Sequence, residues 1–105
     1  MRKKLGLLLM AFAMTCSLSL TAFAGYWRQD GNGWWYVNDD GKYPCNAWQY
    51  IDGKWYYFER EGYMVTNMWK QEYYLGKDGA MLTSTTTPDG FKVDSNGKRI
   101  DTWRN

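Results

Sequence analysis

Apolar positions are distributed in two different ways along the chain. Near the start, residues 5–20 form an apolar run without a charged residue. The run is preceded by Arg2, Lys3 and Lys4 and followed by Ala22-Phe23-Ala24. A basic start, an apolar run and small residues at a cleavage position make up a secretory signal, and the run is short for a membrane span. We therefore expect residues 1–24 to be a signal peptide. Cys16 is a poor lipidation site because the run continues past it.

After residue 24 the pattern becomes an aromatic repeat. Trp27, Trp48 and Trp69 lie 21 residues apart, and the pairs Trp34/Trp55 and Gly41/Gly62 keep the same spacing. A fixed period of this length is typical of repeat architectures. We expect one repeat domain over residues 25–105, with units at about 27–47, 48–68 and 69–87 and a degraded capping unit at 88–105.

Each unit predicts a strand, a tight turn and a second strand. Residues 55–58 (WYYF) have high β propensity, and residues 59–62 end in Gly62, which suits the positive φ of a bulged hairpin loop. Residues 63–66 are expected to form the returning strand. Small hairpins need neighbours to bury their aromatic faces. The predicted fold is all-β, a solenoid of stacked β-hairpins with no helix after residue 24.

Departures from the repeat are confined to its second half. The third unit lacks four residues before its aromatic strand, and Glu72 stands where Trp34 and Trp55 stand in the first two. The fourth unit has Pro88 for the leading Trp and keeps only Phe91 of the aromatic triplet. Five residues are assigned to packing: Val37, Tyr57, Met64, Met81 and Val93. Cys45 is expected to be a buried, unreactive thiol, with an intermolecular disulfide as the alternative.

Charge and residue types exclude several functions. The net charge of +2 rests on Arg2, Lys3 and Lys4, without which ten basic residues face 11 acidic ones and the charge is −1. This is not the basic surface that nucleic acids require. The chain has no histidine, so it offers no Ser-His or Cys-His pair and no zinc cluster. Turn chemistry explains the acids at Asp39, Asp40, Asp52, Asp78 and Asp94. We expect no catalytic residue, metal or cofactor, and no enzyme activity.

Binding chemistry suits the aromatic residues. Trp and Tyr faces are electron-rich, and each attracts a quaternary ammonium by about 0.5–2 kcal/mol. Such a cation donates no hydrogen bond, so a cage of rings is a natural receptor for it. The same rings could instead stack on the apolar faces of sugars.

Two segments carry a family resemblance. The segments GWWYVNDDGKYP (residues 33–44) and GKWYYFEREGYMVTNMW (residues 53–69) resemble the choline-binding, or cell-wall-binding, repeat of Gram-positive surface proteins. The resemblance implies ligand sites between successive hairpins, with two Trp from one repeat and an aromatic residue from the next. The first site would use Trp27, Trp34 and Tyr56, and the second Trp48, Trp55 and Tyr73. A third would have Trp69 and Phe91 but Glu72 in place of the second Trp.

The resemblance implies a secreted module that binds choline on teichoic or lipoteichoic acids, or a related polymer, at the cell surface or cell wall. No nucleic-acid partner and no transmembrane segment in the mature chain are expected. Two alternatives stay open. One is a carbohydrate-binding repeat protein of the glucan type. The other is an adhesive protein that uses the hairpin ribbon to contact other proteins.

We predict cleavage after Ala24, because the basic start, the apolar run and the Ala-Phe-Ala sequence coincide. Mass spectrometry of secreted material should give an N-terminus at Gly25. A mature protein that carries a lipid on Cys16 would contradict this prediction.

Overall fold

The computed structural model describes residues 25–100, and all of its regular structure is β. The predicted signal peptide, residues 1–24, and the end of the capping unit, residues 101–105, lie outside the described residues. Within residues 25–100 no helix forms, which confirms the all-β prediction. The strands are β1 (Tyr26–Asp30), β2 (Gly33–Val37), β3 (Ala47–Ile51), β4 (Lys54–Phe58), β5 (Met68–Lys70), β6 (Tyr73–Leu75), β7 (Thr85–Thr86), β8 (Lys92–Val93) and β9 (Arg99–Ile100).

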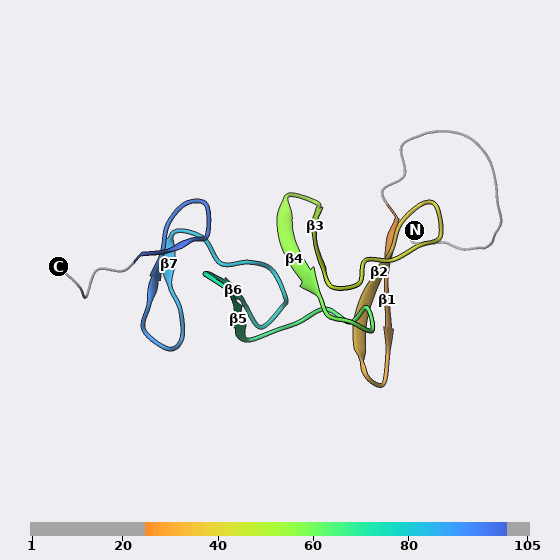
Figure 1. The fold of residues 1–105 in the computed structure, drawn as a ribbon, viewed down its shortest axis with the longest axis horizontal. Helices are drawn as coiled ribbons and strands as arrows, with labels where there is room; N and C mark the ends of the chain where they lie inside the picture. Colours follow the sequence, from red (N-terminus) through yellow and green to blue (C-terminus); the bar gives the residue numbers. More distant parts are fainter. Residues whose placement is uncertain (1–24, 101–105) are drawn as a thin grey trace.

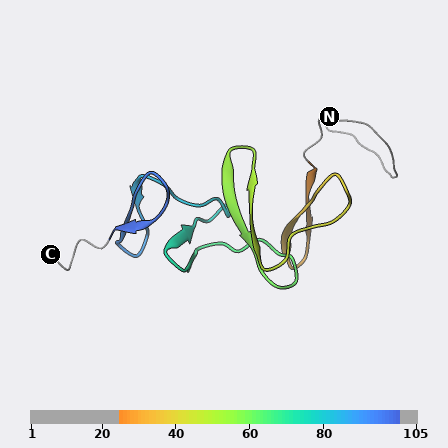
Figure 2. The same ribbon diagram turned by 45° about the horizontal axis from the view of Figure 1, so that its top comes forward.

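The strands form four small antiparallel sheets that follow one another along the chain. β1-β2, β3-β4 and β5-β6 are two-stranded hairpins, and β7-β8-β9 form a three-stranded sheet. The hairpins lie in sequence order along the longest axis of a molecule that measures 55 × 28 × 23 Å (Figures 1 and 2). The last sheet differs from the fourth hairpin that the sequence predicted.

The aromatic strand pairs backwards, with the Trp strand that precedes it. In the second unit, Trp48 lies opposite Tyr57 and Ile51 opposite Lys54. Asp52 and Gly53 make the connecting turn with φ values of 50° and 86°, and Asp-Gly with two positive φ angles is typical of a tight hairpin turn. The predicted forward pairing of residues 55–58 with 63–66 is limited to a single bridge, between Phe58 and Met64.

The predicted glycine turns are confirmed. Those at Gly41, Gly62 and Gly79 join one hairpin to the next, and the one at Gly97 connects the paired strands β8 and β9. Gly41, Gly62, Gly79 and Gly97 have φ between 85° and 96°. In the second unit the Gly62 amide donates to the Glu59 carbonyl at 2.9 Å, as expected of a turn with a glycine bulge. Beyond this turn only a single bridge forms, between Phe58 and Met64.

The segments after the Gly62 and Gly79 turns also bond to the preceding hairpin. The Met64 amide donates to the Trp34 carbonyl at 2.7 Å, and the Met81 amide donates to the Trp55 carbonyl at 2.8 Å. Met64 also bridges Phe58, and the Val65 amide donates to the Tyr57 carbonyl at 2.9 Å, so this segment bonds both to β4 and to the hairpin before it. Each hairpin is thus joined through its backbone to the one before it.

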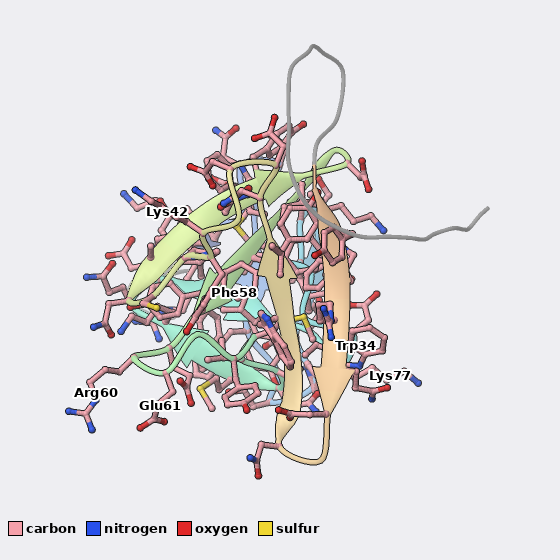
Figure 3. All side chains as sticks on the ribbon, turned by 90° about the vertical axis from the view of Figure 1, so that its right-hand side faces the viewer. Trp34, Lys42, Phe58, Arg60, Glu61 and Lys77 are labelled. Carbon is pink, nitrogen blue, oxygen red and sulfur yellow. The ribbon has the colours of Figure 1, made fainter. Side chains whose placement is uncertain are left out.

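The core is small and mainly aromatic. Phe58 and Leu75 are fully buried, and Phe58 packs with Tyr36 and Ile51, while Trp27, Tyr56 and Met64 cover this cluster. Viewed along the long axis, Phe58 lies near the centre and charged side chains such as Arg60 point outward (Figure 3). The packing assignment holds for Tyr57 and Val93, which are 9% and 3% exposed. It also holds for Met64, which is half-buried but packs against the core cluster, whereas Val37 and Met81 are only half-buried.

Cys45 is exposed, so the expectation of a buried thiol is wrong. It lies in the connection between β2 and β3, where the chain runs along the surface beside the turn of the next unit. A loop position explains the exposure, because no strand face turns this side chain toward the core.

The third hairpin is shorter by two residues in each strand. β5 and β6 have three residues each, whereas the strands of the first two hairpins have five. Trp69 nevertheless keeps its place opposite Tyr74, as Trp48 does opposite Tyr57. The four missing residues noted in the sequence therefore come from the end of the hairpin nearest its turn.

Two glycines at equivalent turn positions give a matched test of packing. A Cβ on Gly41 meets nothing within 4 Å, whereas one on Gly62 lies 2.7 Å from the ring of Tyr43. We expect Gly41→Ala to cost about 1–2 kcal/mol, because of its positive φ. Gly62→Ala should cost about 1–3 kcal/mol more, because the ring must move. Urea unfolding measures both variants, and equal costs would contradict the packing argument.

The buried tyrosine of the core predicts a loss of stability in alkali. Burial raises the pKa of Tyr36 above its ordinary value of 10.0, and the charges of Asp52 and Asp39 raise it further. A raised folded-state pKa gives stability that is complete below the unfolded pKa and is lost as pH rises through the folded pKa. We therefore expect Tyr36→Phe to make the fall in unfolding free energy above about pH 10 shallower. Parallel slopes for wild type and variant would contradict this.

Candidate functional site

Strand alternation places the Trp and Tyr residues of one hairpin on opposite faces. Neighbouring residues in a strand point to opposite sides of the sheet. In β4, Trp55 and Tyr57 therefore share one face with the cross-strand Trp48, and Tyr56 points the other way. Tyr56 faces the previous hairpin, and Trp48 faces the next one. Aromatic groups from two hairpins consequently meet in each gap.

The first cluster contains Trp27, Trp34 and Tyr56. The Trp27 ring lies 6.4 Å from Trp34 and 4.9 Å from Tyr56, with both pairs edge to face. Trp27 also contacts the core rings of Tyr36 and Phe58, whereas Trp34 is 40% exposed. The structure thus brings the first predicted set together, with a half-buried Trp held by the core and an exposed Trp beside it.

The second cluster contains Trp48, Trp55 and Tyr73. Trp48 lies 5.6 Å from Tyr73 at an interplanar angle of 79°, and Trp55 is 41% exposed. These three residues line an open hollow of about 330 Å³ together with Met81 and Asn96. All three predicted residues therefore contribute to one concave surface between successive hairpins.

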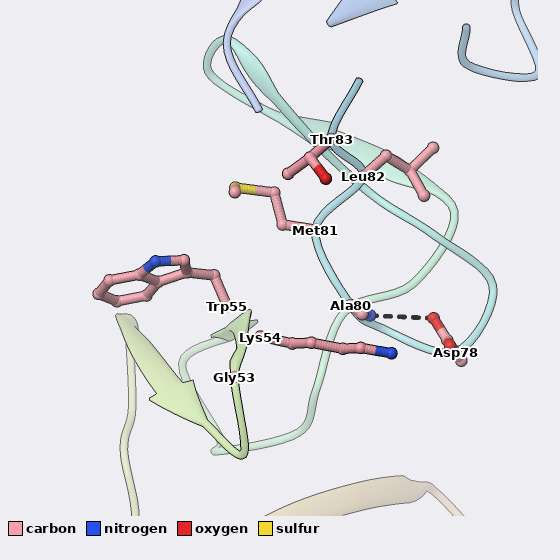
Figure 4. Close-up of a pocket in the computed structure, with 8 residues that line it drawn as sticks. All are labelled: Gly53, Lys54, Trp55, Asp78, Ala80, Met81, Leu82 and Thr83. Atoms are coloured by element: carbon pink, nitrogen blue, oxygen red, sulfur yellow. Dashed lines mark hydrogen bonds between the residues drawn. The ribbon is translucent and has the colours of Figure 1, made fainter. Parts of the chain in front are cut away.

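A second hollow adjoins the first and shares two of its residues. It has a volume of about 390 Å³, and Trp55 and Met81 line both hollows. In the close-up the side chains of Trp55 and Met81 extend to the same side, while Lys54 and Asp78 lie along another part of the wall (Figure 4). The Ala80 amide donates to Asp78 Oδ1 at 3.1 Å, which holds this turn in place (Figure 4).

The electrostatic surroundings of the first cluster favour a cation. Burial raises the pKa of Tyr56, and the negative charges of Asp78 and Asp52 raise it further. The raised pKa keeps Tyr56 a neutral phenol to higher pH than an ordinary tyrosine, and the charges of Asp78 and Asp52 act on its ring. Carboxylates near electron-rich rings attract a positive ligand and repel a negative one.

Two residues of the second hollow were missed by sequence reasoning. Met81 was assigned to packing, but it is half-buried and lines the hollow, and Asn96 was expected only as part of a glycine turn. Met64, at the equivalent position, does cover the core cluster. The sequence did offer one signal for Met81: it follows the turn glycine Gly79 by two residues, just as Met64 follows Gly62. Asn96 lies in the turn that ends at Gly97, and the turn pattern does not show that this turn reaches the second hollow.

The third predicted ring pair also comes together. Trp69 and Phe91 lie 6.0 Å apart at an angle of 80°. The Trp69 indole N–H donates to Asp89 Oδ2 at 2.8 Å, and Glu72 remains exposed. This position has two rings where each of the other two has three.

Acidic side chains in the turns bond to nearby backbone, as the sequence predicted. Asp40 accepts a bond from the Lys42 amide, and Asp94 accepts bonds from the amides of Asn96 and Lys98. Over residues 25–100, no group of three or more acidic or cysteine side chains could hold a metal ion. In the same stretch, no helix is long and apolar enough to cross a membrane.

Family models match most of the repeat region. A choline-binding repeat model matches residues 64–98, and a cell wall binding repeat model matches residues 27–43 and 46–64. A lysin of Pneumococcus phage Dp-1 is 38% identical over 45 residues, which are 41% of this chain and 15% of the lysin. A lysozyme of Streptococcus phage Cp-1 is 47% identical over 30 residues, 29% of this chain and 9% of the lysozyme. The chain thus spans only a small part of these enzymes.

Solved structures share the arrangement. The cell wall endolysin of phage Cp-1 in complex with choline is 37% identical with a TM-score of 0.68, covering 73% of this chain and 25% of the endolysin. The choline binding domain of Spr1274 from Streptococcus pneumoniae is 31% identical with a TM-score of 0.63, covering 72% of this chain and 94% of that domain. The repeats, the hairpins and these similarities agree, and the chain belongs to the choline-binding repeat family.

Proposed function

We propose that this chain is a non-catalytic module that binds choline groups of teichoic or lipoteichoic acids through two aromatic clusters between its hairpins. The observation that carries the proposal is the concave surface shared by Trp48, Trp55 and Tyr73 from two successive hairpins. The first cluster, Trp27, Trp34 and Tyr56, repeats this composition one unit earlier. Choline in the structure of the phage Cp-1 endolysin supports the choice of ligand.

The energetics fit a weak site that works in multiple copies. Three ring faces contribute about 0.5–2 kcal/mol each, and association entropy opposes them. A dissociation constant of 1 mM corresponds to about 4 kcal/mol, so we expect affinities for free choline in the millimolar range. On a polymer that presents many choline groups, two linked sites gain by effective concentration.

The wider architecture and location follow from the same proposal. Consecutive sheets joined by backbone bonds support a solenoid, in which each hairpin supplies one wall to the site before it and two rings to the site after it. Export by residues 1–24 would place the module at the cell wall, where its ligand is found. The phage relatives are named as enzymes, but this chain covers only 15% of the lysin and 9% of the lysozyme, so their names do not assign an activity to it.

Neighbouring tryptophans on opposite faces of β2 provide a matched test. Trp34 belongs to the first cluster, whereas Trp35 packs against Tyr63 and Arg28 on the other face. At choline concentrations 100-fold above the dissociation constant, each site should stabilise the fold by about 2.7 kcal/mol. Trp34→Ala and Tyr56→Ala should each remove the stabilisation that choline provides through the first site. Trp35→Ala and Glu72→Ala should leave the stabilisation by choline unchanged. Melting with and without choline measures this, with each variant compared with itself.

Retention on a choline-mimicking amine resin should fall more steeply than the affinity for free choline, because Trp34→Ala removes one of two linked sites. Trp34→Ala and Tyr56→Ala variants that fold and keep the full choline effect would contradict the cage assignment. A glucan that stabilises the wild-type protein when choline does not would instead favour carbohydrate binding.

A further inference from the structure

Three gaps separate the four sheets: the first lies between β1-β2 and β3-β4, the second between β3-β4 and β5-β6, and the third between β5-β6 and β7-β8-β9. Backbone hydrogen bonds define which residues occupy equivalent places in these gaps. The Met64 amide bonds to the Trp34 carbonyl, the Met81 amide to the Trp55 carbonyl, and the Arg99 amide to the Glu72 carbonyl at 2.9 Å. Glu72 therefore stands where the other gaps have an exposed Trp, and Arg99 stands where they have a Met. In the third gap, the carboxylate of Glu72 thus replaces an aromatic ring, and the guanidinium of Arg99 replaces a thioether.

Arg99 places its guanidinium against the two rings that remain. The guanidinium carbon lies 5.6 Å from the centre of the Trp69 ring and 5.2 Å from that of Phe91. Both distances fall within the range of a cation–π interaction, about 6 Å. Arg99 is half-buried, as are both rings. A cation supplied by the chain thus contacts the two aromatic rings of the third gap.

Carboxylates around this gap add to its preference for a cation. Hydrogen bonds from the Thr87 hydroxyl and the Trp69 indole lower the pKa of Asp89, and the positive charge of Arg99 contributes to the same shift. Asp89 therefore stays ionised at the edge of the Trp69 ring. Glu72 forms an ion pair with Lys98 at 3.5 Å. Both partners of that pair are exposed, so it contributes little to stability.

We propose that the third gap is a cation site whose occupant is Arg99 of the chain itself. Arg99 closes the gap to quaternary ammonium ligands and fastens the β7-β8-β9 sheet to the third hairpin. The inference rests on the proposed function in treating the three gaps as one class of site. It predicts that the described chain binds choline in the first two gaps only, although three pairs of neighbouring sheets are present.

Nuclear magnetic resonance of the wild-type protein tests the closure directly. In a choline titration, the indole N–H signals of Trp34 and Trp55 should shift, while that of Trp69 should stay in place. The side-chain protons of Arg99 should lie upfield of those of the exposed Arg60 before any choline is added, because they sit over two rings. A Trp69 signal that shifts together with the others would overturn the proposal.

The Arg99 signal also separates this inference from the proposed function. If no indole signal responds to choline, the proposed choline sites are wrong, and the position of the Arg99 signals still decides whether its side chain occupies the gap. Arg99 protons at the same shifts as those of Arg60 would overturn the inference whatever choline does.

A redesigned gap gives a second, independent test. The double variant Glu72→Trp with Arg99→Met restores the residue types of the other gaps and should bind one additional choline per chain in equilibrium dialysis. Arg28→Met is the matched control, because Arg28 also lies over a Trp ring, at 5.8 Å from Trp35, but outside the three gaps. The control should bind no additional choline. A folded double variant without the extra choline would contradict the proposal.

Discussion

The structure depends on one constraint, which is that a two-stranded hairpin cannot bury an aromatic face by itself. Each of the first three sheets has only two strands, and such hairpins are marginal in water. The rings therefore become buried only where the next hairpin covers them. Trp27 shows this directly, since it contacts Tyr36 of its own hairpin and Tyr56 and Phe58 of the next. Core and binding surface are consequently built from the same contacts, and the exposed edge of each contact is available to a ligand.

Periodicity in the sequence was enough to predict the repeats and the glycine turns, whereas the two ring clusters were implied by the family resemblance. The repeats and turns follow from local chemistry, since aromatic strands and positive-φ glycines are recognisable residue by residue. The direction of pairing was predicted wrongly because Asp52-Gly53 and the Gly62 turn both signal a reversal of the chain. The structure uses the first for the hairpin and the second for the step to the next sheet.

Other features were hidden because they depend on contacts between units. The equivalent roles of Met64, Met81 and Arg99 appear through their bonds to the preceding hairpin. Each lies two residues after a turn glycine (Gly62, Gly79 and Gly97), but this spacing alone does not show which residue of the preceding hairpin it bonds. Cys45 was misplaced for a related reason, since a loop that follows the surface leaves no pattern of alternating burial.

The shortened third hairpin sets a rule for how units of this kind can change in length. Positions along an antiparallel ladder alternate between two kinds of cross-strand pair. Three cross-strand pairs separate the Trp48–Tyr57 pair from its turn, and one separates the Trp69–Tyr74 pair from its turn. Both numbers are odd. Loss of two pairs, or four residues, therefore returns every ring to its original side of the sheet. Loss of a single pair would turn the Trp of that hairpin away from its neighbour, so lengths in such an array are free to vary only in steps of four.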